Sequence, residues 1–144
     1  MTSDTSGLAS VAQIEALADQ LSACADEIHI RVMKDIHGHN GGPLTDAEQA
    51  IARSMLEDEM LLRQRANGLY ADAAIYTIKS LGQSQQKIVK LTVEAAEKIR
   101  KISKLANAMS LVGGLLLLAG AVATGQAAPI VVAIEKVSRL VKSA

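Results

Sequence analysis

The sequence predicts an all-α protein: a long antiparallel helical hairpin, a helix that runs into an apolar membrane-spanning or membrane-inserting segment, and a short C-terminal amphipathic helix. Three observations support this. Apolar residues recur at helical spacing over most of the chain. Phe and Trp are absent and only two Tyr occur, which argues against aromatic-rich β-sheets. No charged side chain occurs from Leu105 to Ile134.

The first helix is expected after a small, polar N-terminus, residues 1–9, which we expect to be disordered. Ser10 with Gln13 favours a capping box that opens the helix. Apolar residues then recur at steps of three and four, a heptad stripe that predicts packing on another helix. The stripe consists of Val11, Ile14, Ala18, Leu21, Ala25, Ile28 and Val32. Cys24 lies among these positions and is expected to be a buried thiol, since a single cysteine cannot form an intrachain disulfide.

Three glycines and a proline in residues 37–43 predict the end of this helix and a turn. His37 and His39 suggest a metal site. Such a site needs three or four convergent ligands, and only Asp35 or Asn40 could supplement the two histidines. We therefore interpret the segment as a solvated polar turn, with no metal and no other cofactor.

The second helix is predicted to begin at a capping box of Thr45 and Glu48. Its apolar stripe continues to Tyr76, so the two helices would form an acidic hairpin over residues 10–82. Three consecutive acids at 57–59 point in different directions on a helix, and we interpret them as a solvated acidic patch.

A polar stretch with a glycine at residues 81–86 predicts a kink, a hinge or a short break. A basic amphipathic helix over 83–104 follows, and then the apolar segment 105–125. No helix-stop signal separates the two. We therefore expect one continuous helix from about Ser84 to about Thr124.

The apolar segment would span roughly 30 Å as a helix, which matches the hydrocarbon core of a bilayer. The residues predicted to insert are Leu111, Val112, Leu115, Leu116, Leu117, Leu118 and Val122. Small or polar residues recur along the same segment and suit close helix packing or the wall of a narrow polar lumen. They are Asn107, Ser110, Gly114, Gly120, Ala121 and Thr124. A buried core helix, or one buried first and inserted later, is an alternative.

The zero net charge conceals an asymmetry between the two parts of the chain. Residues 1–62 hold eleven acids and three bases, whereas residues 63–144 hold four acids and twelve bases. Bases beside an apolar helix favour anionic lipid headgroups. We assign this role to Lys98, Arg100, Lys101, Lys104, Lys136, Arg139 and Lys142. Nucleic-acid binding is not expected, because no aromatic stacking residues or recognisable motif accompany the bases.

The C-terminal segment, residues 126–144, predicts an amphipathic helix with Pro129 in its first turn. The N-terminus lacks a signal-peptide pattern, so we expect synthesis in the cytoplasm, a soluble form before insertion and final location in a membrane. Basic residues ahead of the span favour a cytoplasmic N-terminal domain. No catalytic motif is present, and an enzyme is not expected.

In organisation, this hairpin, hinge and apolar helix resemble the helical pore-forming toxins, in which a helical bundle stows an apolar segment and later inserts it. The leading hypothesis is a membrane-inserting, self-associating protein that forms a pore or permeabilises an anionic bilayer, as a homo-oligomeric bacterial toxin or cell-killing effector. One alternative is a membrane-anchored scaffold or adaptor whose hairpin of residues 10–80 binds a protein partner. The other is a soluble helical-bundle structural protein.

Overall fold

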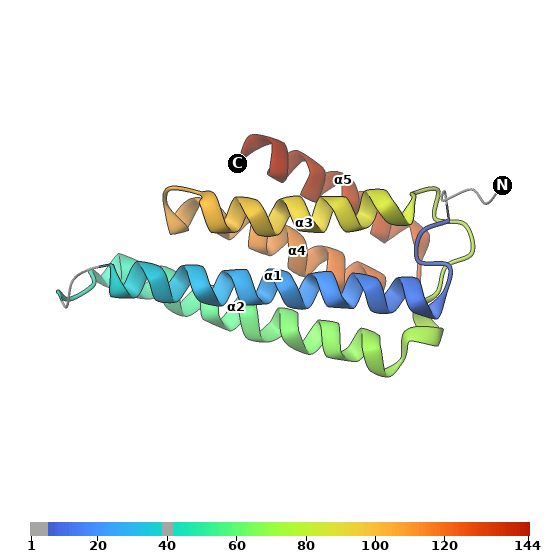
Figure 1. The fold of residues 1–144 in the computed structure, drawn as a ribbon, viewed down its shortest axis with the longest axis horizontal. Helices are drawn as coiled ribbons and strands as arrows, with labels where there is room; N and C mark the ends of the chain where they lie inside the picture. The colour runs from blue at the N-terminus through green and yellow to red at the C-terminus, as the bar shows by residue number, and fades with distance from the viewer. Residues whose placement is uncertain (1–5, 39–41) are drawn as a thin grey trace.

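The computed structural model describes residues 6–38 and 42–144, and within these ranges the chain forms helices and no strands (Figure 1). The α-helices are α1 (Val11–His37), α2 (Asp46–Ala71), α3 (Gln85–Lys101), α4 (Met109–Val122) and α5 (Ala127–Ser143). Two short 3₁₀ helices, η1 (Ala73–Tyr76) and η2 (Leu105–Ala108), precede α3 and α4. The all-α class predicted from the sequence is confirmed.

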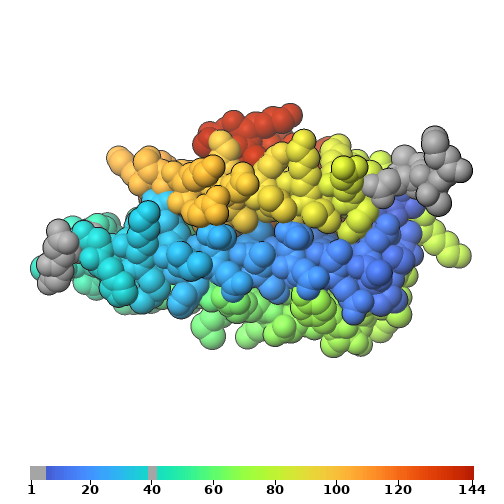
Figure 2. All heavy atoms as spheres, viewed as in Figure 1, coloured from blue at the N-terminus to red at the C-terminus, as the bar shows by residue number. Residues whose placement is uncertain are grey.

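The five α-helices form a closed bundle. α1 packs against α2 as an antiparallel hairpin and against α3 on its other side; α3 packs on α5, α5 on α4, and α4 on α2 (Figure 1). α4 also contacts α1 and α3, so it meets every other α-helix of the described chain. Figure 2 shows α3 and α1 side by side along the molecule, with α5 on the far edge of α3.

Local sequence signals set the beginnings of the hairpin helices. Both predicted capping boxes are present: the hydroxyl of Ser10 accepts from the backbone N–H of Gln13, and that of Thr45 accepts from the N–H of Glu48. In turn, Oε1 of Gln13 accepts from the backbone N–H of Ser10, and Oε1 of Glu48 accepts from the backbone N–H of Thr45. The heptad stripe of α1 is buried from Ile14 to Val32, as expected for a helix packed on its neighbours.

The chain before α1 is ordered where the structure describes it, so the expected disorder of residues 1–9 is wrong for Gly7 and Leu8. The N–H of Gly7 donates to the carbonyl of Gln83 at 2.7 Å, and the carbonyl of Leu8 accepts from Ile78 at 2.8 Å. The Leu8 side chain is fully buried. Residues 1–5 lie outside the described residues.

α2 ends earlier than the apolar stripe predicts. It stops at Ala71, and Tyr76 lies in η1 rather than in a continued α-helix. The β-branched residues of this stretch lower its helix propensity, and the stretch is tied to the N-terminal segment instead through Ile78. The break expected at 81–86 is therefore part of a wider connection between α2 and α3.

The predicted continuous helix from Ser84 to Thr124 is wrong. α3 ends at Lys101, the backbone is extended at Ile102 and Lys104, and α4 runs back antiparallel to α3 (Figure 1). The physical reason is the hydrophobic effect. A helix without charged residues has a lower free energy when it packs back onto the bundle than when it extends into water.

α5 follows the prediction closely. Pro129 lies in its first turn, and Ile130, Ile134, Val137 and Val141 are buried on one face. This face packs back on α4 and α3, so α5 is part of the bundle.

Candidate membrane-inserting helix

The apolar segment is helical and partly buried against the other helices of the bundle. By length and composition, Leu105–Val122 is the one helical segment of the described chain that could cross a membrane, and 56% of it is buried within the bundle. A core helix of a soluble protein has the same properties. The 18 residues would span about 27 Å if fully α-helical, close to the thickness of a hydrocarbon core.

Most of the predicted inserting residues are core residues here. Leu111, Val112, Leu115, Leu118 and Val122 are at most 1% exposed. Deep burial of five large aliphatic side chains on one helix means that release of α4 would expose much of the core to water. In this bundle the helix is therefore held in place by the same side chains that would enter a membrane.

The remaining two inserting residues lie on the outer side of α4. Leu116 is half-buried and Leu117 is 43% exposed. Together with Pro129 and Val132 of α5 they line a shallow surface depression, which we call the α4–α5 groove. Val132 is 61% exposed, and Arg65 of α2 also lines the groove. The groove therefore presents an apolar surface next to a cation.

The predicted helix-packing or lumen residues do not share one wall in this form. Asn107 and Ser110 are exposed and line a depression near the C-terminus of α5. Gly114 faces α5, where an added Cβ would lie 2.8 Å from Leu140 Cδ1. The others line the α4–α5 groove; they are Gly120, Ala121 and Thr124.

The predicted headgroup residues lie on α3, on the α3–α4 connection and on α5. Six of the seven are exposed, and Lys98 is half-buried, donating to the carbonyl of Ala144 at 3.1 Å. The exposed six are Arg100, Lys101, Lys104, Lys136, Arg139 and Lys142. Because α3 packs on α5, these bases occupy neighbouring helices of the bundle.

A buried arginine that the sequence reasoning missed lies where α3 ends. Arg31 of α1 is 7% exposed. Its Nη1 donates to the carbonyls of Ile99 and Arg100 at 3.2 and 3.3 Å, and its Nη2 donates to the carbonyl of Ser103 at 3.1 Å. Its Nε donates to Asp35 at 3.0 Å. Arg31 stands three residues after Ile28, so helical spacing placed it on the buried side of the stripe.

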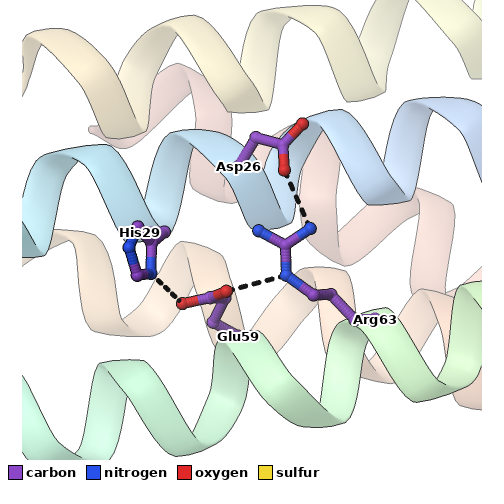
Figure 3. A network of polar contacts seen from close by, with 4 residues as sticks. All are labelled: Asp26, His29, Glu59 and Arg63. Atoms are coloured by element: carbon purple, nitrogen blue, oxygen red, sulfur yellow. Dashed lines mark hydrogen bonds and ion pairs between the residues drawn. The ribbon is translucent and has the colours of Figure 1, made fainter.

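A second missed group joins α1 to α2 (Figure 3). Glu59 is 6% exposed and accepts from Arg63 at 2.7 Å, while its other oxygen lies 2.9 Å from Nδ1 of His29. Arg63 also reaches Asp26 at 2.8 Å, and these hydrogen bonds, that to Glu59 first, raise the pKa of Arg63. The expected solvated acidic patch at 57–59 is thus wrong for Glu59, whose pairing compensates its burial.

The histidines show no arrangement for metal binding within the described ranges. There, no group of three or more His, Cys, Asp or Glu side chains is placed to hold a metal ion. His37 is exposed at the end of α1, and His29 contacts Glu59. His39 and Asn40 of the predicted polar turn lie outside the described residues.

The fold and the stowed apolar segment together define an all-α bundle with one candidate membrane helix. No protein-family model, curated protein or solved structure matches the chain.

Proposed function

We propose that this protein is a membrane-inserting, self-associating helical protein that permeabilises an anionic bilayer, as a toxin or cell-killing effector. The observation that carries the proposal is α4: a charge-free helix, stowed in a bundle, with the length to cross a hydrocarbon core once joined to η2. The bundle described above is its water-soluble form.

The surface of the bundle supports a first contact with lipid. Leu117 and Val132 expose apolar side chains in the α4–α5 groove, and exposed bases lie on α3 and α5. Apolar side chains partition into the interface, and each base near an anionic surface adds about 1 kcal/mol of attraction. Once at the bilayer, the buried leucines of α4 would exchange core contacts for lipid contacts of similar apolar character.

Dye release from vesicles tests this function, with Leu117→Arg as the decisive variant. Leu117 is exposed at 43%, so a charge there leaves the soluble fold intact, but at mid-bilayer an arginine costs about 2.5–3.5 kcal/mol. We expect wild type to release dye from anionic vesicles and Leu117→Arg to release at least about tenfold more slowly, with unchanged circular dichroism.

Met60→Arg is the matched control, because Met60 of α2 is also exposed, at 62%, but lies outside the apolar segment. It should release dye like wild type. No dye release by wild type in any lipid composition would refute the proposal, and so would equal effects of the two arginine substitutions.

The same variants separate a second function, a membrane-anchored adaptor. Ile30 of α1 and Met60 of α2 expose large apolar side chains on the hairpin that would bind a protein partner. An adaptor would lose membrane association in Leu117→Arg and keep its partner. It would bind vesicles without releasing dye.

A further inference from the structure

The reversal between α3 and α4 has no local sequence cause. Residues 102–108 contain neither glycine nor proline, yet the backbone is extended at Ile102 (φ −62°, ψ 138°) and at Lys104 (φ −116°, ψ 130°). Residues of this kind are compatible with an α-helix. Contacts from elsewhere in the molecule must therefore hold the reversal.

Besides the burial of α4, the side chain of Arg31 provides polar contacts at the reversal. The last carbonyls of a helix have no partner within the helix. The guanidinium reaches two such carbonyls of α3, Ile99 and Arg100, and also the carbonyl of Ser103 inside the reversal. Its positive charge lies at the negative end of the α3 dipole. A planar group with several fixed donors suits these three acceptors better than an ammonium would.

Burial makes this contact costly to lose. Arg31 is 7% exposed, and Asp35 one turn further along α1 pairs with its Nε and orients the group. Without the guanidinium, carbonyls of the reversal would lack the donor that the folded state gives them. They would recover partners within the chain if residues 102–108 became α-helical, because each carbonyl would then accept from the N–H four residues later.

We propose that Arg31 is a latch that holds α3 and α4 apart, and that its release lets them join into one helix that delivers the apolar segment to the membrane. The joined helix, residues 85–122, would be about 57 Å long. Lys98, Lys101 and Lys104 would then precede the charge-free segment directly, at the depth of anionic headgroups. The role in insertion rests on the proposed function, whereas the effect on the reversal does not.

Hydrogen exchange without lipid tests the latch itself. In Arg31→Met, which keeps side-chain length and removes the donors, we expect exchange of residues 99–108 to be at least about tenfold faster than in wild type. Arg63→Met is the matched control, since Arg63 also joins two helices through ion pairs but lies away from the reversal. It should leave residues 99–108 unchanged. Wild-type exchange in Arg31→Met, or equal acceleration in both variants, would overturn the latch.

If Arg31→Met fails to fold, Arg31→Lys decides. Lysine retains the positive charge but lacks the planar guanidinium. Faster exchange confined to residues 99–108 would support the latch, whereas exchange at the wild-type rate would refute it. On anionic vesicles, a folded latch variant should release dye faster than wild type by a factor similar to its gain in exchange. If wild type releases no dye at all, the proposed function fails and the exchange result still decides the latch.

Discussion

At the scale of single residues, Cys24 illustrates a side chain whose chemistry is suppressed by its place in the bundle. Its thiol lies between α1 and α3 and donates to the carbonyl of Thr92 at 3.4 Å. Burial, with a smaller contribution from Glu27, raises the pKa of the thiol from 9.0 to about 12. Since the thiolate is the reactive form, Cys24 acts as a small apolar residue at neutral pH, the role expected from the stripe.

This pKa shift predicts a loss of stability at alkaline pH. Above pH 9 the thiol of the unfolded chain ionises while the folded protein keeps it protonated, so rising pH favours the unfolded state. Between pH 8 and pH 10 we expect the free energy of unfolding of wild type to fall by about 1 kcal/mol more than that of Cys24→Ala. Urea titrations at both pH values measure this difference; parallel losses in the two proteins would mean that the thiol ionises equally in both states.

For Arg31 and Glu59, burial could be predicted from the sequence but the hydrogen-bond partners could not. Both occupy positions on a buried face that periodicity could have identified, since Arg31 follows Ile28 by three residues and Glu59 follows Met55 by four. Their partners could not be identified in the same way. The acceptors of Arg31 lie about seventy positions away in sequence, on a segment expected to be helical, and burial of a charge is plausible only once its partners are known.

At the scale of elements, the beginnings of α1 and α2 and the end of α1 were predictable, whereas the ends of α2 and α3 were not. Ser10 and Thr45 form caps with residues three positions away, so the local sequence is enough to predict these helix beginnings. The ends of α2 and α3 lie near contacts with distant segments. The carbonyl of Leu8 accepts from Ile78 after α2, and Arg31 donates to the carbonyl of Ile99 at the end of α3. The charge-free run itself was evident from the sequence, but its reversal onto the bundle was not.

The glycines of α4 give a prediction at this scale. A Cβ at Gly113 or Gly120 would meet nothing within 4 Å, so packing in this bundle does not require glycine there. We expect Gly113→Ala/Gly120→Ala to raise the free energy of unfolding by about 0.5–1 kcal/mol per site, from helix propensity alone. In a membrane assembly that packs helices through small residues, the same change should slow dye release.

Gly114→Ala is the control on the same helix. Its new methyl would meet Leu140 of α5, so it should stabilise the bundle less than the outward-facing pair does. Thermal denaturation and dye release of the three proteins separate the two effects. A double variant that is more stable in water and equally active on vesicles would show that small residues are not needed on that face.

At the scale of the whole molecule, the charge asymmetry of the sequence becomes an asymmetry of surfaces. The acid-rich part of the chain forms α1 and most of α2, whereas α3 and α5, which pack together, carry most of the bases. A molecule with net charge zero can in this way still orient at a charged surface, because the local field and not the total charge acts within a Debye length.

Vesicle binding should therefore depend on where a base is removed and not only on how many are removed. Lys136 and Arg139 are exposed on α5, and Lys34 and Arg53 are exposed on α1 and α2. We expect Lys136→Gln/Arg139→Gln to weaken binding to anionic vesicles on the order of 30-fold, from about 1 kcal/mol per base. The matched pair Lys34→Gln/Arg53→Gln removes the same charges and should weaken it much less. Co-sedimentation at low and high salt measures the vesicle affinity of both double variants, and high salt should abolish the difference between them. Equal losses of affinity would mean that the molecule meets the membrane without a preferred face.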